Sequence, residues 1–182
     1  MVEDDASDWR DALWKANAPL FEGIPPFATG IGTLPAGWCE LVESLCARLT
    51  AAATAASGRV HVSRLYEDRA VIEVVCKAIP PNAGLEAVVA EVAARAAARS
   101  ACTCAACGRP GARYRIAFRV FAACPLHMPR GSVEVFPNWP TIRVVRSIVA
   151  GRSRIVACEA YDRGLDRFVA SSPEALGIRH FP

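Results

Sequence analysis

The hydrophobic positions of the chain follow two different periods, and together they predict a mixed fold. Between residues 37 and 56, apolar residues recur at steps of three and four, which is the period of a helix with one buried face. A second helical pattern covers residues 84–98. Residues 60–66 and 71–76 lie between them and form strand-like runs, separated by the polar turn Glu67-Asp68-Arg69. The predicted core is therefore a helix, two strands and a second helix.

The ends of the chain show other patterns. Trp9, Leu13 and Trp14 share a helical face and predict a short first helix, which is followed by an irregular connection rich in proline and glycine. Residues 113–121 alternate basic and apolar side chains and predict one strand with a buried and a wet face. Beyond residue 129, strand-like runs cover residues 133–136, 141–149 and 154–161. We predict an α+β fold in three parts: residues 1–36, an N-terminal helix and irregular arm; residues 37–128, the α+β core; residues 129–182, a strand-rich C-terminal subdomain.

Two pairs of metal-ligating residue types follow the second helix. Cys104 and Cys107 form the first pair, and Cys124 and His127 form the second, with sixteen residues between the two pairs. Two such pairs, each spaced by two residues, are typical of a structural zinc site on a zinc-ribbon-like hairpin. Four protein ligands leave no coordination position for water, which argues against metal catalysis. Cys102 is an alternative ligand in place of His127.

The composition indicates a cellular compartment, and the compartment in turn indicates the state of the other cysteines. The chain has 182 residues and 53% hydrophobic content, which is typical of a folded domain, and no apolar run long enough to predict a membrane span. Its acidic N-terminus carries no secretory leader, so we expect a cytoplasmic protein. In that reducing compartment, the remaining cysteines are expected as small buried hydrophobes: Cys39, Cys46, Cys76 and Cys158.

Charge is distributed unevenly and suggests two kinds of partner. Residues 1–98 carry a net charge of −5, and residues 99–182 carry +8, all of the latter's basic residues being arginine. An arginine-rich surface suits a nucleic-acid backbone, although the scarcity of lysine also fits the composition of a GC-rich bacterium. Trp139 is a candidate anchor for a protein partner, because aromatic residues and arginine dominate interface hot spots. The candidate arginines are Arg109, Arg113, Arg115, Arg119, Arg143, Arg146, Arg152 and Arg154.

Catalytic signatures are missing from the sequence. It contains no nucleophile elbow, phosphate loop or dinucleotide fingerprint. A zinc deaminase needs a His-x-Glu element, whereas His61 is followed by Val62 and Ser63. The sequence therefore favours a non-catalytic, zinc-stabilised protein that binds a protein partner, in the manner of an inhibitor, an immunity protein or an adaptor. The alternative is a nucleic-acid-binding zinc protein that uses the arginine-rich C-terminal half.

Five short motifs occur together in residues 19–127. They are Pro19-Leu20-Phe21, Gly37-Trp38 at the start of a helix that continues through Leu41 and Leu45-Cys46, a helix end at Ser100, Cys104-Ala105-Ala106-Cys107-Gly108, and Cys124-Pro125-Leu126-His127. In this combination the chain resembles a family of small, uncharacterised bacterial and prophage proteins. The resemblance implies a metal-binding role for Cys104, Cys107, Cys124 and His127 and a link to mobile elements, and it brings no established activity.

Overall fold

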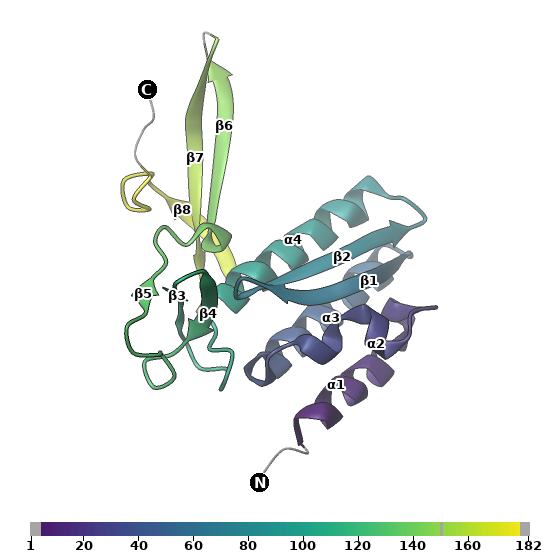
Figure 1. Ribbon diagram of the computed structural model, residues 1–182. Coiled ribbons are helices and arrows are strands. Elements are labelled where there is room, and N and C mark those ends of the chain that lie inside the picture. The colour runs from purple at the N-terminus through teal and green to yellow at the C-terminus, as the bar shows by residue number, and fades with distance from the viewer. Residues whose placement is uncertain (1–4, 150, 179–182) are drawn as a thin grey trace.

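Two long helices and a two-stranded hairpin form the body of the protein (Figure 1). The computed structural model describes residues 5–149 and 151–178. Helix α3 spans Cys39–Ala55 and helix α4 spans Ala83–Ala101. Strands β1 (Arg59–Asp68) and β2 (Val71–Ile79) pair antiparallel, with β1 packed on α3 and β2 on α4. The predicted order of helix, two strands and helix is confirmed, and so is the α+β class.

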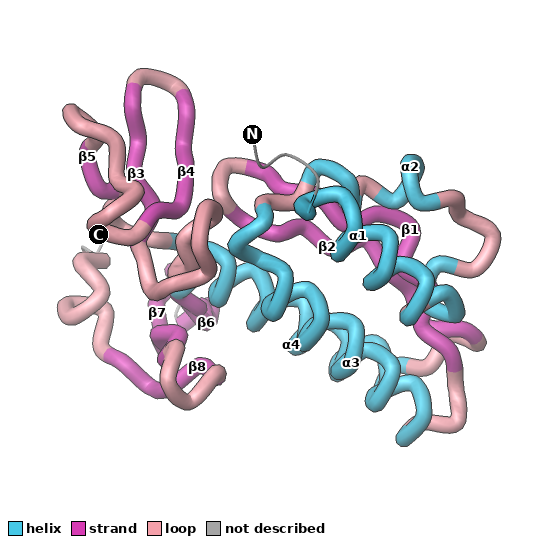
Figure 2. The backbone as a smooth tube through the Cα atoms, turned by 90° about the horizontal axis from the view of Figure 1, so that it is seen from below, coloured by secondary structure: helices cyan, strands magenta, loops and turns pink. Residues whose placement is uncertain are grey.

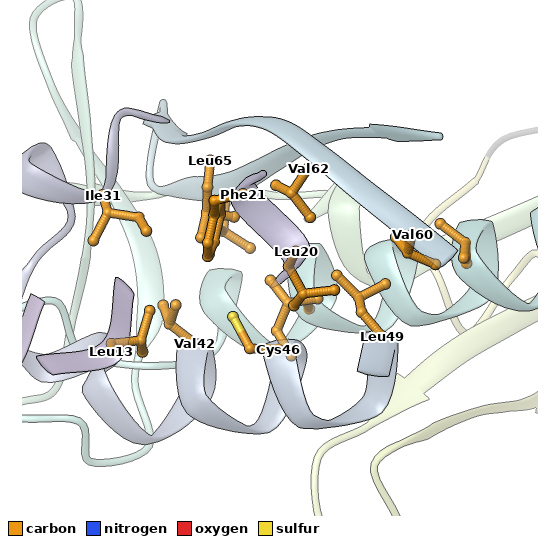
Figure 3. Packing of buried hydrophobic residues seen from close by; sticks show 14 of the residues in the cluster. Leu13, Leu20, Phe21, Ile31, Val42, Cys46, Leu49, Val60, Val62 and Leu65 are labelled. Carbon is orange, nitrogen blue, oxygen red and sulfur yellow. The ribbon is translucent and has the colours of Figure 1, made fainter. Parts of the chain in front are cut away.

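The N-terminal segment belongs to the same hydrophobic core as the body. Helix α1 (Asp5–Ala16) is followed by the short turns η1 (Ala18–Phe21), α2 (Pro26–Thr29), η2 (Ile31–Thr33) and η3 (Ala36–Trp38). Leu13, Phe21 and Ile31 are buried in one cluster with Val42 and Leu49 of α3 (Figure 3). The described part of residues 1–36, predicted as an N-terminal helix and irregular arm, shares its core with the predicted second part of the chain.

The segment that carries the candidate metal ligands differs from its prediction. Residues 113–121 do not form one strand, because the chain reverses at Ala117, whose φ is +50°. The reversal produces β3 (Ala112–Ile116) and β4 (Arg119–Ala123), which pair with each other. The short strand β5 (Val133–Glu134) pairs with the other edge of β3. We call residues 102–128 the Cys/His hairpin.

A second small sheet completes the chain. After the turn η4 (Trp139–Thr141), β6 (Ile142–Val149), β7 (Arg152–Asp162) and β8 (Arg167–Ser171) form an antiparallel sheet in that order. The strands β6 and β7 are confirmed, whereas β8 was not predicted. Both small sheets lie at one end of the molecule, beyond the end of α4 (Figure 2). No helix in the described part of the chain is long and apolar enough to cross a membrane.

Ion pairs attach this second sheet to the body. Asp166, in the turn between β7 and β8, pairs with Arg48 of α3 and with Arg99 of α4. Burial acts to raise the pKa of Asp166, but hydrogen bonds from Tyr161 and Arg48 outweigh it and lower this pKa. Arg143 of β6 lies 2.6 Å from a carboxylate oxygen of Glu91 on α4. The C-terminal subdomain therefore docks on the helices through charged groups rather than through a second large apolar core.

Candidate metal centre

The four predicted ligands come together in space. The candidate ligand atoms all lie within 4.8 Å of one another; they are the Sγ atoms of Cys104, Cys107 and Cys124 and a ring nitrogen of His127. Cys107 Sγ lies 3.7 Å from Cys124 Sγ, and His127 Nδ1 lies 3.5 Å from Cys104 Sγ and 3.4 Å from Cys124 Sγ. The sulfur atoms are too far apart for a disulfide, which needs about 2.05 Å. This cluster is compatible with a metal site.

Two tight turns present these atoms to each other. In the first, Gly108 N donates to Cys104 O at 2.9 Å, and Gly108 takes a φ of +73°, which favours glycine. In the second, His127 N donates to Cys124 O at 2.9 Å, directly after β4 ends. Ala105 N donates to Ala122 O at 2.9 Å and so ties the first turn to the end of β4. These backbone hydrogen bonds therefore hold the two pairs face to face.

The first turn rests on the entry of helix α3. Gly37 N donates to Ala105 O at 2.9 Å, and the buried Trp38 indole Nε1 donates to Thr103 O at 3.2 Å. A Cβ atom on Gly37 would lie 2.5 Å from Gly108 N and 2.7 Å from Cys107 N, so only glycine fits at this position. The sequence shows Gly37-Trp38 as a helix start, but it carries no signal that these residues hold the Cys104–Cys107 turn.

The site is half buried, and Arg109 lies on its outer side. Cys104 and Cys124 are buried, whereas His127 is exposed. Arg109 Nε donates to Cys107 Sγ at 3.4 Å, and this hydrogen bond is the main cause that lowers the pKa of Cys107 to about 6. Burial raises the pKa of Cys104. Arg109, predicted as part of an arginine surface, therefore faces a candidate ligand.

The other cysteines lie outside this cluster. Cys102 is not among the clustered residues, so the structure does not support it as an alternative ligand. Cys46 and Cys158 are buried as predicted, and burial raises the pKa of Cys46 to about 12. Cys39 and Cys76 are only half buried, so the prediction of core packing holds in part for these two.

Some arginines of the predicted surface are buried or paired in the structure, and the others are exposed. Arg113 was expected on the wet face of its strand, but only 9% of it is exposed. Its guanidinium donates to Arg69 O at 2.9 Å and to Asn138 Oδ1 at 3.3 Å, so it connects three segments of the fold. Arg143 is held by Glu91 and Glu159 and stacks on Phe168. The remaining candidates of known side-chain placement are exposed: Arg115, Arg119, Arg146 and Arg154.

Large apolar side chains are exposed mainly in the C-terminal half. Among the described residues, fourteen large hydrophobic side chains are exposed, and seven of them belong to the segment from Ile116 to Trp139. Phe118, at the tip of the β3–β4 turn, is 91% exposed, and Trp139 is 55% exposed. Val120, Phe121 and Pro129 line a hollow on the same hairpin. The exposed large apolar side chains of the described residues are thus concentrated on this hairpin and the segment after it.

Searches of known protein families, of curated proteins and of solved structures found no match to this chain. The resemblance to a prophage family therefore stays a prediction, and the site has to be interpreted from its own geometry.

Proposed function

We propose that the Cys/His cluster binds one structural zinc ion. Zinc–sulfur and zinc–nitrogen bonds of about 2.3 and 2.05 Å, arranged tetrahedrally, put sulfur atoms about 3.8 Å apart and sulfur and nitrogen about 3.6 Å apart. The 3.7 Å between Cys107 and Cys124, and the 3.5 and 3.4 Å from His127 Nδ1 to its two neighbours, agree with those spacings. Three thiolates and an imidazole are also a common structural zinc donor set.

The protein that this ion stabilises is, in our proposal, a non-catalytic binding protein of the inhibitor, immunity or adaptor type. A single observation supports a protein partner above others: the Cys/His hairpin and the segment after it expose one large apolar side chain after another. Ile116, Phe118, Leu126, Met128 and Val133 are all exposed within eighteen residues. Protein interfaces bury such residues at their centre, with arginine enriched beside them. Arg115 and Arg119 provide that charge here.

Nucleic acid is not the preferred partner of this hairpin. The predicted phosphate-binding face needed Arg113, which is buried against Arg69 O, and Arg109, which donates to Cys107 Sγ. Two exposed arginines, Arg115 and Arg119, are left on a surface that is otherwise largely apolar. Backbone binding of nucleic acid depends on clustered positive charge rather than on apolar area.

Metal analysis of purified protein tests the zinc assignment. We expect one zinc per chain in the wild type and its loss in Cys124→Ser. Cys102→Ser is the matched control, because this cysteine is close in sequence to Cys104 but outside the cluster. A wild-type protein that takes up no zinc on refolding, or a Cys124→Ser protein that retains a full equivalent, would contradict the assignment.

Two phenylalanines of nearly equal exposure test the partner surface. Phe118 is 91% exposed on the Cys/His hairpin, and Phe27 is 88% exposed on α2, away from the hairpin. Proteins retained from a cell lysate by the wild type and by Phe27→Ser, but lost with Phe118→Ser, are then purified and titrated by calorimetry. We expect Kd to rise at least tenfold for Phe118→Ser, as for a hot-spot residue. Equal behaviour of the two variants would refute the proposed surface.

A further inference from the structure

The outer part of the β6–β7 hairpin projects from the molecule without support (Figure 1). The ladder between the two strands continues from Ile142 paired with Ala160 to Val149 paired with Arg152. Strand β8 pairs with β7 only from Cys158 to Asp162, which is the base of the hairpin. We call residues 145–149 and 152–157 the distal ribbon. Among the described residues, neither edge of this ribbon has a neighbouring strand.

Both faces of the distal ribbon are open to solvent. Ile148 is 79% exposed, and Val145 and Val156 are exposed as well. A two-stranded ribbon without a packed face is only marginally stable in water, so a ribbon of this kind is expected to be covered when it functions. β-Branched residues favour the extended backbone, which explains how the ribbon forms.

The charge of the ribbon is all of one sign. From Ile142 to Cys158 the sequence contains four arginines and no acidic residue. Arg143, at the base, is neutralised by Glu91 and Glu159. Arg146 and Arg154, further out, are exposed and have no ion-pair partner in the described part of the chain. The ribbon is therefore a free positive arm on a separate element from the apolar Cys/His hairpin.

The register places these two arginines on opposite faces. Arg146 is paired with Ile155, and Arg154 is paired with Ser147, so Arg146 and Arg154 belong to successive, oppositely facing positions of the ladder. A ribbon that enters a groove with its edge toward the bases presents one face to each phosphate backbone. The major groove of B-form DNA is about 12 Å wide and admits a two-stranded β-ribbon. An arginine on each face then reaches a phosphate on each side.

We propose that the distal ribbon binds double-stranded DNA in the major groove, with Arg146 and Arg154 on the phosphates of the two strands. The positive charge of the ribbon favours DNA over a second copy of the chain as its partner. A second copy that paired along an open edge of the ribbon would bring two arms of the same positive charge together, which is destabilising. The proposal is independent of the protein partner, because it uses a different element and no residue of the Cys/His hairpin.

Fluorescence anisotropy of a labelled 25-base-pair DNA duplex with the full-length, zinc-loaded protein tests this proposal. For the wild type, we expect saturable binding that weakens as salt rises. Each phosphate contact contributes about 0.9 to the slope of log K against log salt and about eightfold in affinity at 0.1 M salt. Arg146→Gln with Arg154→Gln should therefore lower the slope by about 1.8 and the affinity by about 60-fold.

Three controls keep the result specific. Arg59→Gln with Arg64→Gln changes the net charge by the same amount on β1 and should leave binding close to that of the wild type. Ile148→Ser is a neutral change on the same face as Arg146 and should leave the salt slope unchanged. Phe118→Ser should bind DNA as the wild type does, so that failure of the protein-partner proposal is seen separately.

Several results would overturn the proposal. They are absence of binding at 0.05 M salt, an equal loss in the two double-arginine variants, and equal affinity for an RNA duplex of the same sequence, whose major groove is too narrow for a ribbon. Competition by poly-glutamate that is as strong, charge for charge, as competition by DNA would assign the arm to an acidic protein instead.

Discussion

Replacing Gly37 by alanine tests whether the entry of α3 and the candidate metal turn form one unit. The added methyl group would lie 2.5 Å from Gly108 N and 2.7 Å from Cys107 N, where ordinary contact begins at 3.4 Å. These backbone atoms would have to retreat by about 0.7 to 0.9 Å. A retreat of that size breaks the bond from Gly37 N to Ala105 O and moves the Cys107 thiol away from the other three ligands.

The cost follows from these two effects. Overpacking at a rigid site costs about 1 to 3 kcal/mol, and the lost hydrogen bond about 1 kcal/mol. Because the turn that has to move carries Cys104 and Cys107, we expect this cost to appear as weaker metal binding. A loss of about 2 to 4 kcal/mol corresponds to a rise in the zinc Kd of roughly 30- to 700-fold.

Competition with a chromophoric chelator measures that zinc Kd, and thermal unfolding of the zinc-loaded protein measures stability. Gly32→Ala is the matched control, because a Cβ atom at Gly32 meets nothing within 4 Å and the residue has no positive φ. The reasoning is refuted if Gly37→Ala and Gly32→Ala give the same zinc Kd. If the melting temperature falls while the zinc Kd is unchanged, the turn has moved away from α3 as a unit and has kept the arrangement of its ligands.

Three further predictions concern the contacts that join the Cys/His hairpin and the C-terminal sheet to the body of the protein. Removing the metal with a chelator should make the amides of residues 102–127 exchange rapidly with deuterated solvent, while the buried turns of α3 stay protected; uniform exchange would contradict a local role of the site. Arg113→Met should destabilise the protein by about 1 to 3 kcal/mol in urea unfolding, because Arg69 O loses its partner, whereas Arg115→Met, at an exposed position, should change stability by less than about 0.5 kcal/mol. The stability that Asp166 adds over Asp166→Asn should be fully present above its unfolded pKa of about 3.9 and decline as the pH falls further, because its folded pKa is lowered; a difference that does not change with pH would contradict the ion-pair network.

The sequence predicted the body of the fold and the four clustered residues for physical reasons. Helical and strand periods are long and regular in residues 37–98, since each element there has one face in a single core. The spacing of Cys104, Cys107, Cys124 and His127 is a local property of two tight turns. Such features depend on neighbours in the chain, so they are visible without a structure.

The missed features depend on partners far away in the chain. The turn has the apolar sequence Ile116-Ala117-Phe118, with no glycine, proline, asparagine or aspartate, so nothing in the pattern marks Ala117 as the reversal point. Arg113 is buried because Arg69 and Asn138, 44 and 25 residues away, accept its hydrogen bonds. The constraint on Gly37 likewise comes from a turn that lies about seventy residues further along the chain.

The candidate metal site therefore has a structural role beyond its own hairpin. Its first turn is fixed to the body through Gly37 and Trp38, and Gly108 O accepts a bond from Arg163, in the turn between β7 and β8, at 3.5 Å. Arg113 of β3 donates hydrogen bonds both to the β1–β2 turn and to the loop before β6, and so connects these two segments. Bound zinc would hold the Cys/His hairpin between body and C-terminal sheet, and so would fix the exposed apolar surface and the distal ribbon relative to each other. The two proposed binding surfaces then depend on one ion for their mutual orientation, although neither touches it directly.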